Sequence, residues 1–262
     1  NAFLQLFEII KAHQAKEDDE TTDDDTTDDK DQEEPDDTTD DTTRLQTAIN
    51  YCSSKKLDCY IPSGTYRVSK VSITNSVNII GENNNTIIKS TDANTEDSII
   101  YIENNGLYNS SIKNITIDGN NGACGDKGLR AIFITTGGTY SFDNIKTEDV
   151  TYSINTGTTE AVTLNVEDTT LEGWSSYGDT TTASFKNVKF ECGKYANLKA
   201  YTSTVLEGCS FEAGFMIDFE EIEAGETLTF KNCTYNGQPM TEESFINGTV
   251  KIDGDFTGKI AF

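Results

Sequence analysis

From residue 61 onward, apolar and polar residues alternate in short segments that glycine and asparagine interrupt. Clear examples are IPSGTYRV at 61–68, IKNITIDGNNG at 112–122 and YSFDNIKTEDV at 140–150. Alternation with a period of two residues predicts β-strands that bury one face. We therefore expect this part of the chain to form many short strands joined by tight turns.

Three of the later segments can be superposed: ASFKNVKFECG from residue 183, TVLEGCSFEAG from 204 and LTFKNCTYNG from 228. The superposition places Val188, Cys209 and Cys233 in one column and Leu171, Phe190, Phe211 and Tyr235 in another. A spacing of about twenty residues is typical of a coiled stack of rungs, in which each rung buries its apolar residues against the next. A β-sandwich, with strands every 8–12 residues, is the alternative that this longer spacing disfavours.

One helix is predicted immediately before the strands. Leu45, Ala48, Ile49 and Cys52 fall on one face of a helix, which we expect at 42–56 with Thr42 or Thr43 as its N-cap. The first rung of a solenoid exposes apolar side chains and unpaired strand edges. The helix is therefore predicted to cover that end.

These residues carry a family resemblance. The pattern Asp41-Thr42-x-x-Leu45-Gln46-x-Ala48-Ile49, followed by Pro62-x-Gly64-Thr65-Tyr66, resembles the N-terminal motif of the pectin-lyase-like superfamily. The resemblance covers residues 40 to about 240. It implies an all-β, right-handed, single-stranded parallel β-helix, which we place at 42–262. The superfamily includes pectate lyases, polygalacturonases, phage tailspikes and fibres, and surface proteins without catalysis, so the fold alone leaves the function open.

The segments before residue 42 are predicted to be separate from the β-helix. Residues 1–16 read as an amphipathic docking or oligomerisation helix, with an anchoring face formed by Phe3, Leu6, Phe7 and Ile10. Residues 17–41 hold sixteen acidic residues and one lysine, which is −15 of the net charge of −25. Such a segment repels itself and should form a flexible linker. It has no EF-hand pattern, and no metal site is predicted.

Composition excludes several partners. The chain has only three arginines, so we expect no nucleic-acid binding, and polyanionic polysaccharides are disfavoured unless a cation bridges them. No apolar run approaches the ~20 residues of a membrane span. The six cysteines show no zinc-binding spacing, and a disulfide between Cys52 and Cys59 stays open.

Candidate catalytic residues are few. The single histidine, His13, lies in the N-terminal helix, whereas a polygalacturonase-like site needs a Gly-His-Gly motif and paired aspartates. Two clusters could hold a catalytic pair: Asp118, Asp126, Lys127 and Arg130 for lyase chemistry, and Asp218, Glu220, Glu221 and Glu223 for hydrolysis. A glycine-rich loop between rungs explains the first cluster without chemistry, and a solvated strand face explains the second better than a catalytic pair does. We therefore expect a protein that is not an enzyme and has no cofactor.

Aromatic residues supply the remaining candidate site. Trp174 and Tyr177, with Tyr195 and Tyr201 one rung later, could form a shelf for sugar rings or a subunit interface.

The layout predicts a phage virion fibre, of head or tail, as the first hypothesis. In that hypothesis residues 1–16 attach to a capsid or tail protein, and the β-helix projects toward a cell-surface glycan. Resemblance to phage β-helix proteins implies a homotrimer. A bacterial surface adhesin, outside the cell, and a polysaccharide lyase or hydrolase are the alternatives.

Overall fold

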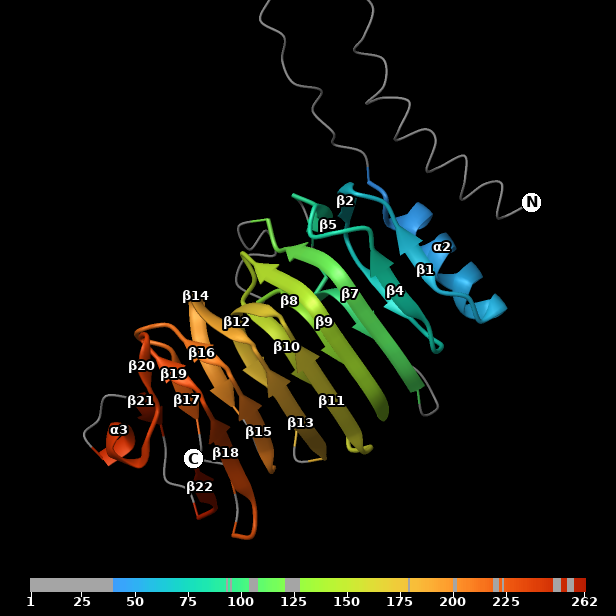
Figure 1. The fold of residues 1–262 in the computed structure, drawn as a ribbon. Helices are drawn as coiled ribbons and strands as arrows, with labels where there is room; N and C mark the ends of the chain where they lie inside the picture. The colour runs from blue at the N-terminus through green and yellow to red at the C-terminus, as the bar shows by residue number, and fades with distance from the viewer. Residues whose placement is uncertain are drawn as a thin grey trace, which may run out of the picture.

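Parallel strand pairing winds the chain into a stack of coils (Figure 1). The strands of successive coils form three parallel sheets, which enclose one core. This computed structural model describes residues 40–262 except 93, 95, 104–107, 121–127, 179, 200–201, 219–221, 223, 247–250 and 254–256. The architecture is a parallel β-helix, as predicted. The predicted docking helix at 1–16 and the acidic linker up to residue 39 lie outside the described residues.

The first sheet contains β1 (Cys59–Ile61), β4 (Asn78–Gly81), β11 (Val162–Glu167), β13 (Thr181–Lys186), β15 (Thr204–Glu207), β18 (Thr227–Lys231), β22 (Lys259–Ala261) and the N-terminal parts of β7 (Tyr108–Asp118) and β9 (Gly138–Glu148). The second sheet contains the C-terminal parts of β7 and β9, β2 (Gly64–Val68), β5 (Thr86–Ser90), β16 (Ser210–Phe211), β19 (Thr234–Tyr235) and the N-terminal parts of β12 (Thr170–Ser176) and β14 (Lys189–Lys199).

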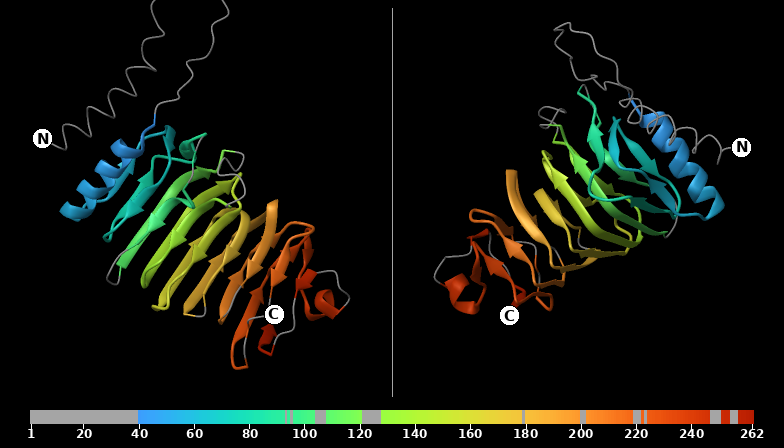
Figure 2. Two further views of the ribbon diagram at one scale, coloured as in Figure 1. Left: turned by 180° about the vertical axis from the view of Figure 1, so that it is seen from behind. Right: turned by 45° about the horizontal axis from the view of Figure 1, so that its top comes forward.

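The third sheet contains the C-terminal parts of β12 and β14, with β3 (Val71–Ile73), β6 (Ser98–Ile102), β8 (Arg130–Ile134), β10 (Tyr152–Thr156), β17 (Met216–Asp218) and β21 (Lys251–Asp253). Helix α2 (Thr42–Lys55) lies at one end of the coil (Figure 2). The short antiparallel strand β20 (Gln238–Pro239) and helix α3 (Glu242–Ile246) lie toward the other end.

Helix α2 is the predicted lid. It covers the first coil, and it also makes hydrogen bonds to the backbone groups at the open strand edge of that coil. Leu45, Ile49 and Cys52 face the core. The Gln46 side chain donates from Nε2 to the carbonyl of Ser72 (2.8 Å) and accepts at Oε1 from the Ser72 N–H (2.7 Å). One amide side chain thus makes the two hydrogen bonds that a neighbouring strand would otherwise make.

The N-cap prediction was wrong. Asp41 occupies the N-cap position, and Thr42 is the first helical residue. The Thr42 hydroxyl accepts a hydrogen bond from the Ser69 N–H (2.9 Å), and the Asp41 N–H donates to the Arg67 carbonyl (2.7 Å). The side chain expected to cap the helix is instead used to saturate the open strand edge.

The corner between the first and second sheets is built from residues in the left-handed region. They are Asn114, Asn144, Asp168, Asn187, Gly208 and Asn232. Glycine and asparagine tolerate this conformation best among the residue types, which explains their recurrence in the sequence. Asn144 Nδ2 also donates to Asn114 Oδ1 of the preceding coil (2.9 Å). These corners fix where six successive coils turn and therefore hold their strands in register.

The core is a narrow column, and its register is the predicted one. Leu171 pairs with Phe190, Phe190 with Phe211, and Phe211 with Tyr235. The rings of Phe190 and Phe211 lie 4.6 Å apart and almost parallel. Because each coil contributes only a few inward side chains, a hydrophobic fraction of 35% is enough to fill the core.

Carboxylates stack on the outer side of the second sheet. Glu172 lies opposite Glu191 of the next coil and in register with Glu148 of the preceding one. Its Oε1 accepts a hydrogen bond from the Asp149 N–H (3.1 Å). Partial burial, followed by the charges of Asp149, Glu148 and Glu191, raises the pKa of Glu172 above its ordinary value. In the described residues, no group of three or more His, Cys, Asp or Glu side chains is arranged to hold a metal ion.

Replacing Gln46 tests the role of the lid. Gln46→Ala should lower the free energy of unfolding by about 1–3 kcal/mol, because the N–H and carbonyl of Ser72 lose their partners at a protected edge. Thr47→Ala, at an exposed position of the same helix, is the control. Urea denaturation measures both variants, and an equal effect of the two would contradict an edge-satisfying role for Gln46.

Replacing Glu172 tests the carboxylate stack. A carboxyl group whose pKa is raised in the folded state binds its proton more tightly there, so stability falls as pH rises from about 4.3, the ordinary glutamate pKa, through the raised value. Glu172→Gln should therefore raise the melting temperature at pH 7, on the order of 1–2 °C. At pH 3 the difference should vanish. Scanning fluorimetry at both pH values measures the melting temperatures, with Glu207→Gln at an exposed position as the control. A gain in melting temperature for Glu172→Gln that is the same at pH 3 and pH 7 would refute the prediction.

Candidate functional site

The outer side of the third sheet gathers aromatic, amide and charged side chains from successive coils. We call this surface the third-sheet strip. It comprises Tyr101, Arg130, Phe133, Tyr152, Asn155, Trp174, Asn197, Lys199 and Asp218. Tyr152 pairs with Arg130 on one side and with Trp174 on the other, and Trp174 pairs with Asn197. Parallel pairing in register therefore brings residues far apart in sequence to neighbouring positions.

A β-bulge shapes the middle of the strip. The pairing of β10 with β12 changes register between Tyr152 and Asn155. Ser153 and Ile154 between them are both buried, which a regular alternating strand does not allow. The extra inward residue lets Tyr152 and Asn155 both belong to the outer side, where they lie in register with Arg130 and Phe133.

Arg130 lies at the centre of an aromatic cluster. Its guanidinium carbon is 4.7 Å from the ring centres of both Phe133 and Tyr152. The Tyr152 ring is 5.4 Å from that of Trp174, and the Phe133 ring is 5.7 Å from that of Tyr101. Stacking on aromatic faces suits a guanidinium, which remains charged at all relevant pH values. The cluster is therefore a fixed positive charge framed by flat apolar surfaces.

Buried polar atoms without a hydrogen-bond partner concentrate on this strip. Among the described residues there are five such side-chain atoms, and four belong to the strip: Arg130 Nε, Asn155 Oδ1, Trp174 Nε1 and Asn197 Oδ1. Leaving a buried polar atom unsatisfied costs about 1–3 kcal/mol, and native proteins contain few. Their concentration on one surface, across adjacent coils, points to a role other than stability.

An ion pair continues the strip beyond the aromatic cluster. Lys199 Nζ lies 3.8 Å from Asp218 Oδ2, and the two side chains are only 16% and 8% exposed. A lysine and an aspartate this close can both exchange protons with a bound molecule. The strip thus combines stacking surfaces, a fixed cation and groups able to transfer protons.

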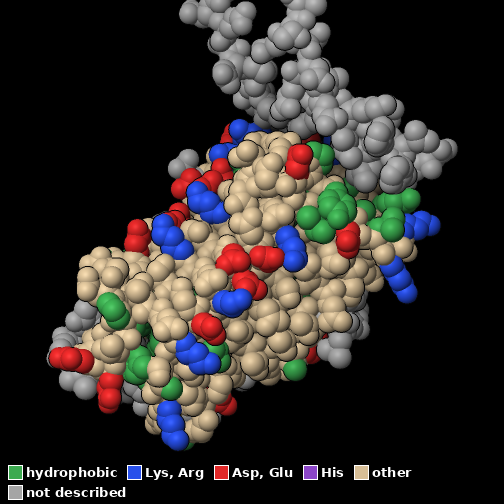
Figure 3. Space-filling view, viewed as in Figure 1, with side chains coloured by type: hydrophobic (Ala, Val, Ile, Leu, Met, Phe, Trp, Pro, Cys, Tyr) green, Lys and Arg blue, Asp and Glu red, His purple; other side chains and the backbone are tan. Residues whose placement is uncertain are grey.

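The first sheet presents a different surface. In the view of Figure 3, acidic and basic side chains lie beside one another on a surface otherwise formed mainly by backbone and small polar groups. Lys113 pairs with Asp143 (3.0 Å), and Lys186 pairs with Glu167. No large patch of a single charge is visible on this face.

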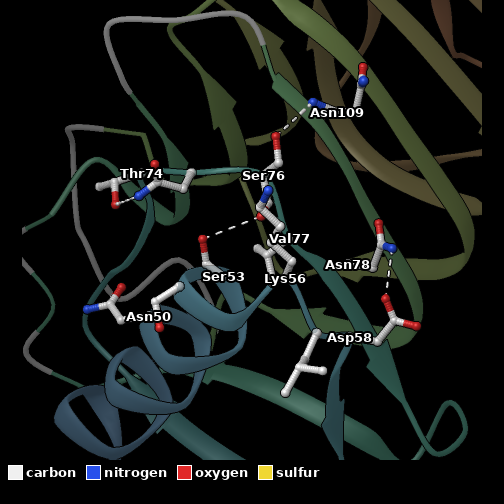
Figure 4. Close-up of a pocket in the computed structure, with 12 residues that line it drawn as sticks. Asn50, Ser53, Lys56, Asp58, Thr74, Ser76, Val77, Asn78 and Asn109 are labelled. Atoms are coloured by element: carbon white, nitrogen blue, oxygen red, sulfur yellow. Dashed lines mark hydrogen bonds between the residues drawn. The ribbon is translucent and has the colours of Figure 1, made fainter.

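A polar hollow of about 700 Å³ lies where the end of α2 meets residues 74–78 (Figure 4). Ser53 Oγ donates to the Ser76 carbonyl (3.4 Å), and Asn78 Nδ2 donates to Asp58 Oδ1 (2.9 Å). The lining is mainly amides and hydroxyls, with one lysine, Lys56, and one aspartate. Such a hollow can accommodate a small polar molecule, but it lacks the aromatic surfaces and the buried ion pair of the strip.

The predicted aromatic shelf is only partly reproduced. Trp174 lies on the strip, as a sugar-contact residue would. Tyr177 is only 1% exposed and packs against Phe185 with 5.6 Å between ring centres, so it belongs to the core and cannot contact a ligand at the surface. The side chain of Tyr195 and the whole of Tyr201 lie outside the described residues.

The predicted acidic clusters separate in the structure. Asp118 binds Lys89 Nζ (2.6 Å) and the Asn120 N–H (2.6 Å) at the end of the second sheet, which is a structural role. Arg130 lies on the strip, and Asp126 and Lys127 lie outside the described residues. In the second cluster Asp218 pairs with Lys199, while Glu220, Glu221 and Glu223 lie outside the described residues.

Sequence reasoning missed the other aromatic members of the strip, Tyr101, Phe133 and Tyr152. Tyr101 and Phe133 stand next to apolar residues in segments that read as buried strand, SIIYI and RAIFI, whereas Tyr152 begins the mostly polar segment YSINT. Extending the superposed register backward through β10, β8 and β6 would have aligned them.

Comparisons with known proteins bear on the family. A sequence model described as rhamnogalacturonase A/epimerase, pectate lyase-like, matches residues 33–240. Among solved structures, the A-module of a mannuronan C-5 epimerase from Azotobacter vinelandii has a TM-score of 0.51 and 16% identity, covering 85% of this chain and 72% of that one. At this identity the structural likeness establishes the fold alone. No curated protein matches the chain.

The expectation that the protein is not an enzyme is overturned by this family match, because the family is named after polysaccharide-modifying enzymes. That expectation relied on the absence of a histidine and of an acidic pair from the solenoid, whereas the strip offers other groups for proton transfer. The match spans most of the chain and includes the lid motif and the repeating coils. The chain therefore belongs to the rhamnogalacturonase A/epimerase, pectate lyase-like family.

Proposed function

We propose that this protein modifies a uronate-containing polysaccharide that lies along the third-sheet strip. The observation that carries the proposal is Arg130, a cation with no ion-pair partner among the described residues, held between the rings of Phe133 and Tyr152. A guanidinium binds a carboxylate through parallel hydrogen bonds. Aromatic surfaces on either side suit the apolar faces of sugar rings.

The strongly acidic composition does not oppose this substrate locally. The acidic residues at 17–41 supply most of the net charge, and they precede the β-helix. Charges separated by more than about 8 Å are largely screened at physiological ionic strength. A sugar carboxylate over Arg130 would therefore respond mainly to the charges within that distance of it. The earlier expectation against polyanionic polysaccharides considered the whole chain rather than this surface.

The reaction class that best fits the strip is proton abstraction next to the sugar carboxylate, as in a lyase or an epimerase. Such a reaction needs a cation to neutralise the carboxylate and a group to accept the proton. Arg130 supplies the first. For the second, the candidates are Tyr152 and the carboxylate of Asp218, because Lys199 in its ion pair with Asp218 already carries a proton. Hydrolysis normally uses two carboxylates flanking the bond. Among the strip side chains that the structure describes, Asp218 is the only carboxylate.

Attachment to a virion, a homotrimer and a capsid or tail partner remain predictions that the comparisons leave untested. The predicted attachment depends on Phe3, Leu6, Phe7 and Ile10, which lie outside the described residues, whereas the predicted homotrimer rests on the resemblance to phage β-helix proteins. No described helix is both long and apolar enough to cross a membrane.

Activity on a panel of uronate polysaccharides tests the proposal. The parent protein should generate unsaturated chain ends or change the uronate stereochemistry of at least one member. Arg130→Ala should lower kcat/KM by roughly 10²-fold, the scale seen when one preorganised electrostatic contact is removed. Lys113→Ala, which removes an exposed cation from the first sheet, is the matched control and should retain full activity.

Arg130→Lys separates charge from geometry, since lysine keeps the charge but loses the two parallel donors. It should have intermediate activity. Circular dichroism establishes that each variant folds. An active parent whose kcat/KM is unchanged by Arg130→Ala would place the chemistry elsewhere on the molecule, and a parent inactive on the whole panel would refute the substrate class.

A further inference from the structure

The outer positions of the third sheet form two columns that run along the stack of coils. One column contains Arg130, Tyr152, Trp174 and Asn197, and the other contains Phe133, Asn155, Ser176 and Lys199. Residues in register on adjacent coils lie about 4.8 Å apart. The two columns therefore show which of the buried, unpartnered polar atoms of the strip are neighbours.

These four atoms form two pairs, each with one hydrogen-bond donor and one acceptor. Trp174 Nε1 is a donor, and Asn197, in register with it on the next coil, carries the acceptor Oδ1. Arg130 Nε is a donor, and Asn155, diagonally opposite on the next coil, carries the acceptor Oδ1. Among the described residues none of the four atoms has a partner, so the members of a pair are not bonded to each other. One group that both accepts and donates can bridge each pair.

Asn155 is the more deeply buried of the two asparagines, with only 6% of its surface exposed. Arg130 and Phe133 of β8 face Tyr152 and Asn155 of β10, so the four residues form the corners of one unit. The Arg130 guanidinium carbon is 4.7 Å from the ring centres at two opposite corners, Phe133 and Tyr152. The guanidinium therefore lies between those rings and beside the remaining corner, Asn155. A carboxylate that binds Arg130 brings the other groups of the same sugar ring to Asn155.

We propose that Asn155 and Asn197 are specificity-determining residues, each of which accepts a hydrogen bond from a hydroxyl group of the bound sugar chain. This inference rests on the proposed function of the strip. A hydroxyl group accepts as well as donates. Each sugar hydroxyl therefore accepts from the paired donor, Arg130 Nε or Trp174 Nε1, and donates to the asparagine Oδ1. The two asparagines are two coils apart, about 10 Å, so they contact different sugar rings.

The energetics of a buried amide separate this role from a structural one. A buried amide without a partner lowers folding stability, so an apolar side chain of similar shape should stabilise the fold. A residue that costs stability and contributes to binding is typical of functional sites. A water molecule also accepts and donates, and it is the alternative bridge for each pair. Removing an amide that is satisfied by water should lower stability and leave substrate binding unchanged.

Asn155→Leu and Asn197→Leu test the inference on the uronate polysaccharide that the parent protein modifies. Leucine keeps the branched shape of asparagine without its polar atoms. Each variant should raise KM roughly tenfold and keep kcat within about twofold, because the lost hydrogen bond is present in the ground state and the transition state alike. Each should also melt about 2–4 °C above the parent in scanning fluorimetry.

Two further variants keep the test sharp. Asn155→Ala removes the amide without adding volume, so it should raise KM to the same extent even if leucine does not fit. Asn165→Leu, at an exposed position of the first sheet, is the matched control and should change neither KM nor the melting temperature.

The outcomes distinguish this inference from the proposed function. A kcat/KM that depends on Arg130 but not on Asn155 or Asn197 would overturn the inference and leave the proposed function standing. A lower melting temperature of the asparagine variants with an unchanged KM would assign the amides to bound water and overturn it as well. A kcat/KM that does not depend on Arg130 would remove the proposed function, and the inference with it.

Discussion

A parallel β-helix depends on what happens at its first open edge, where the N–H and carbonyl groups of one coil have no preceding strand. In this protein the lid supplies the missing partners. Gln46 makes both backbone hydrogen bonds of Ser72, and Thr42 binds the Ser69 N–H. Helix α2 thus acts as a substitute strand, and all later coils build on an edge that is already satisfied.

The register set at that edge is carried along the coil by its corners. Asparagine or another residue in the left-handed conformation turns six successive coils at an equivalent point, from Asn114 to Asn232, so inward and outward side chains stay in columns. The same regularity that stacks Phe190 on Phe211 inside also aligns Arg130, Tyr152 and Trp174 outside. The bulge in β10 departs from the regular pattern and lies in the middle of the candidate site, and the pairing of β12 with β14 also shifts register, between Glu172 and Gly173. The inward columns of side chains stabilise the fold, and the outward columns on the third sheet form the candidate site.

The fold was predictable from the sequence because its determinants are local and repeated. The lid motif, the apolar columns and the asparagine corners are all visible as spacings. The candidate site was harder to predict from the sequence, because its residues come from different coils. They can be recognised as neighbours only when the register between those coils is known. Tyr177 shows the limit: it stands three residues after Trp174, yet it turns into the core. The expectation of a protein that is not an enzyme was wrong because it rested on missing residue types, a histidine and paired acids in the β-helix, and not on which side chains the coils bring together.

We propose that the third-sheet strip binds the sugar chain, and a crystal structure of the protein with a uronate oligosaccharide would decide it. Sugar rings should lie over Tyr152 and Trp174, with a carboxylate bound to the guanidinium of Arg130. An oligosaccharide seated in the polar hollow beside α2, or on the first sheet, with the strip unoccupied, would contradict it.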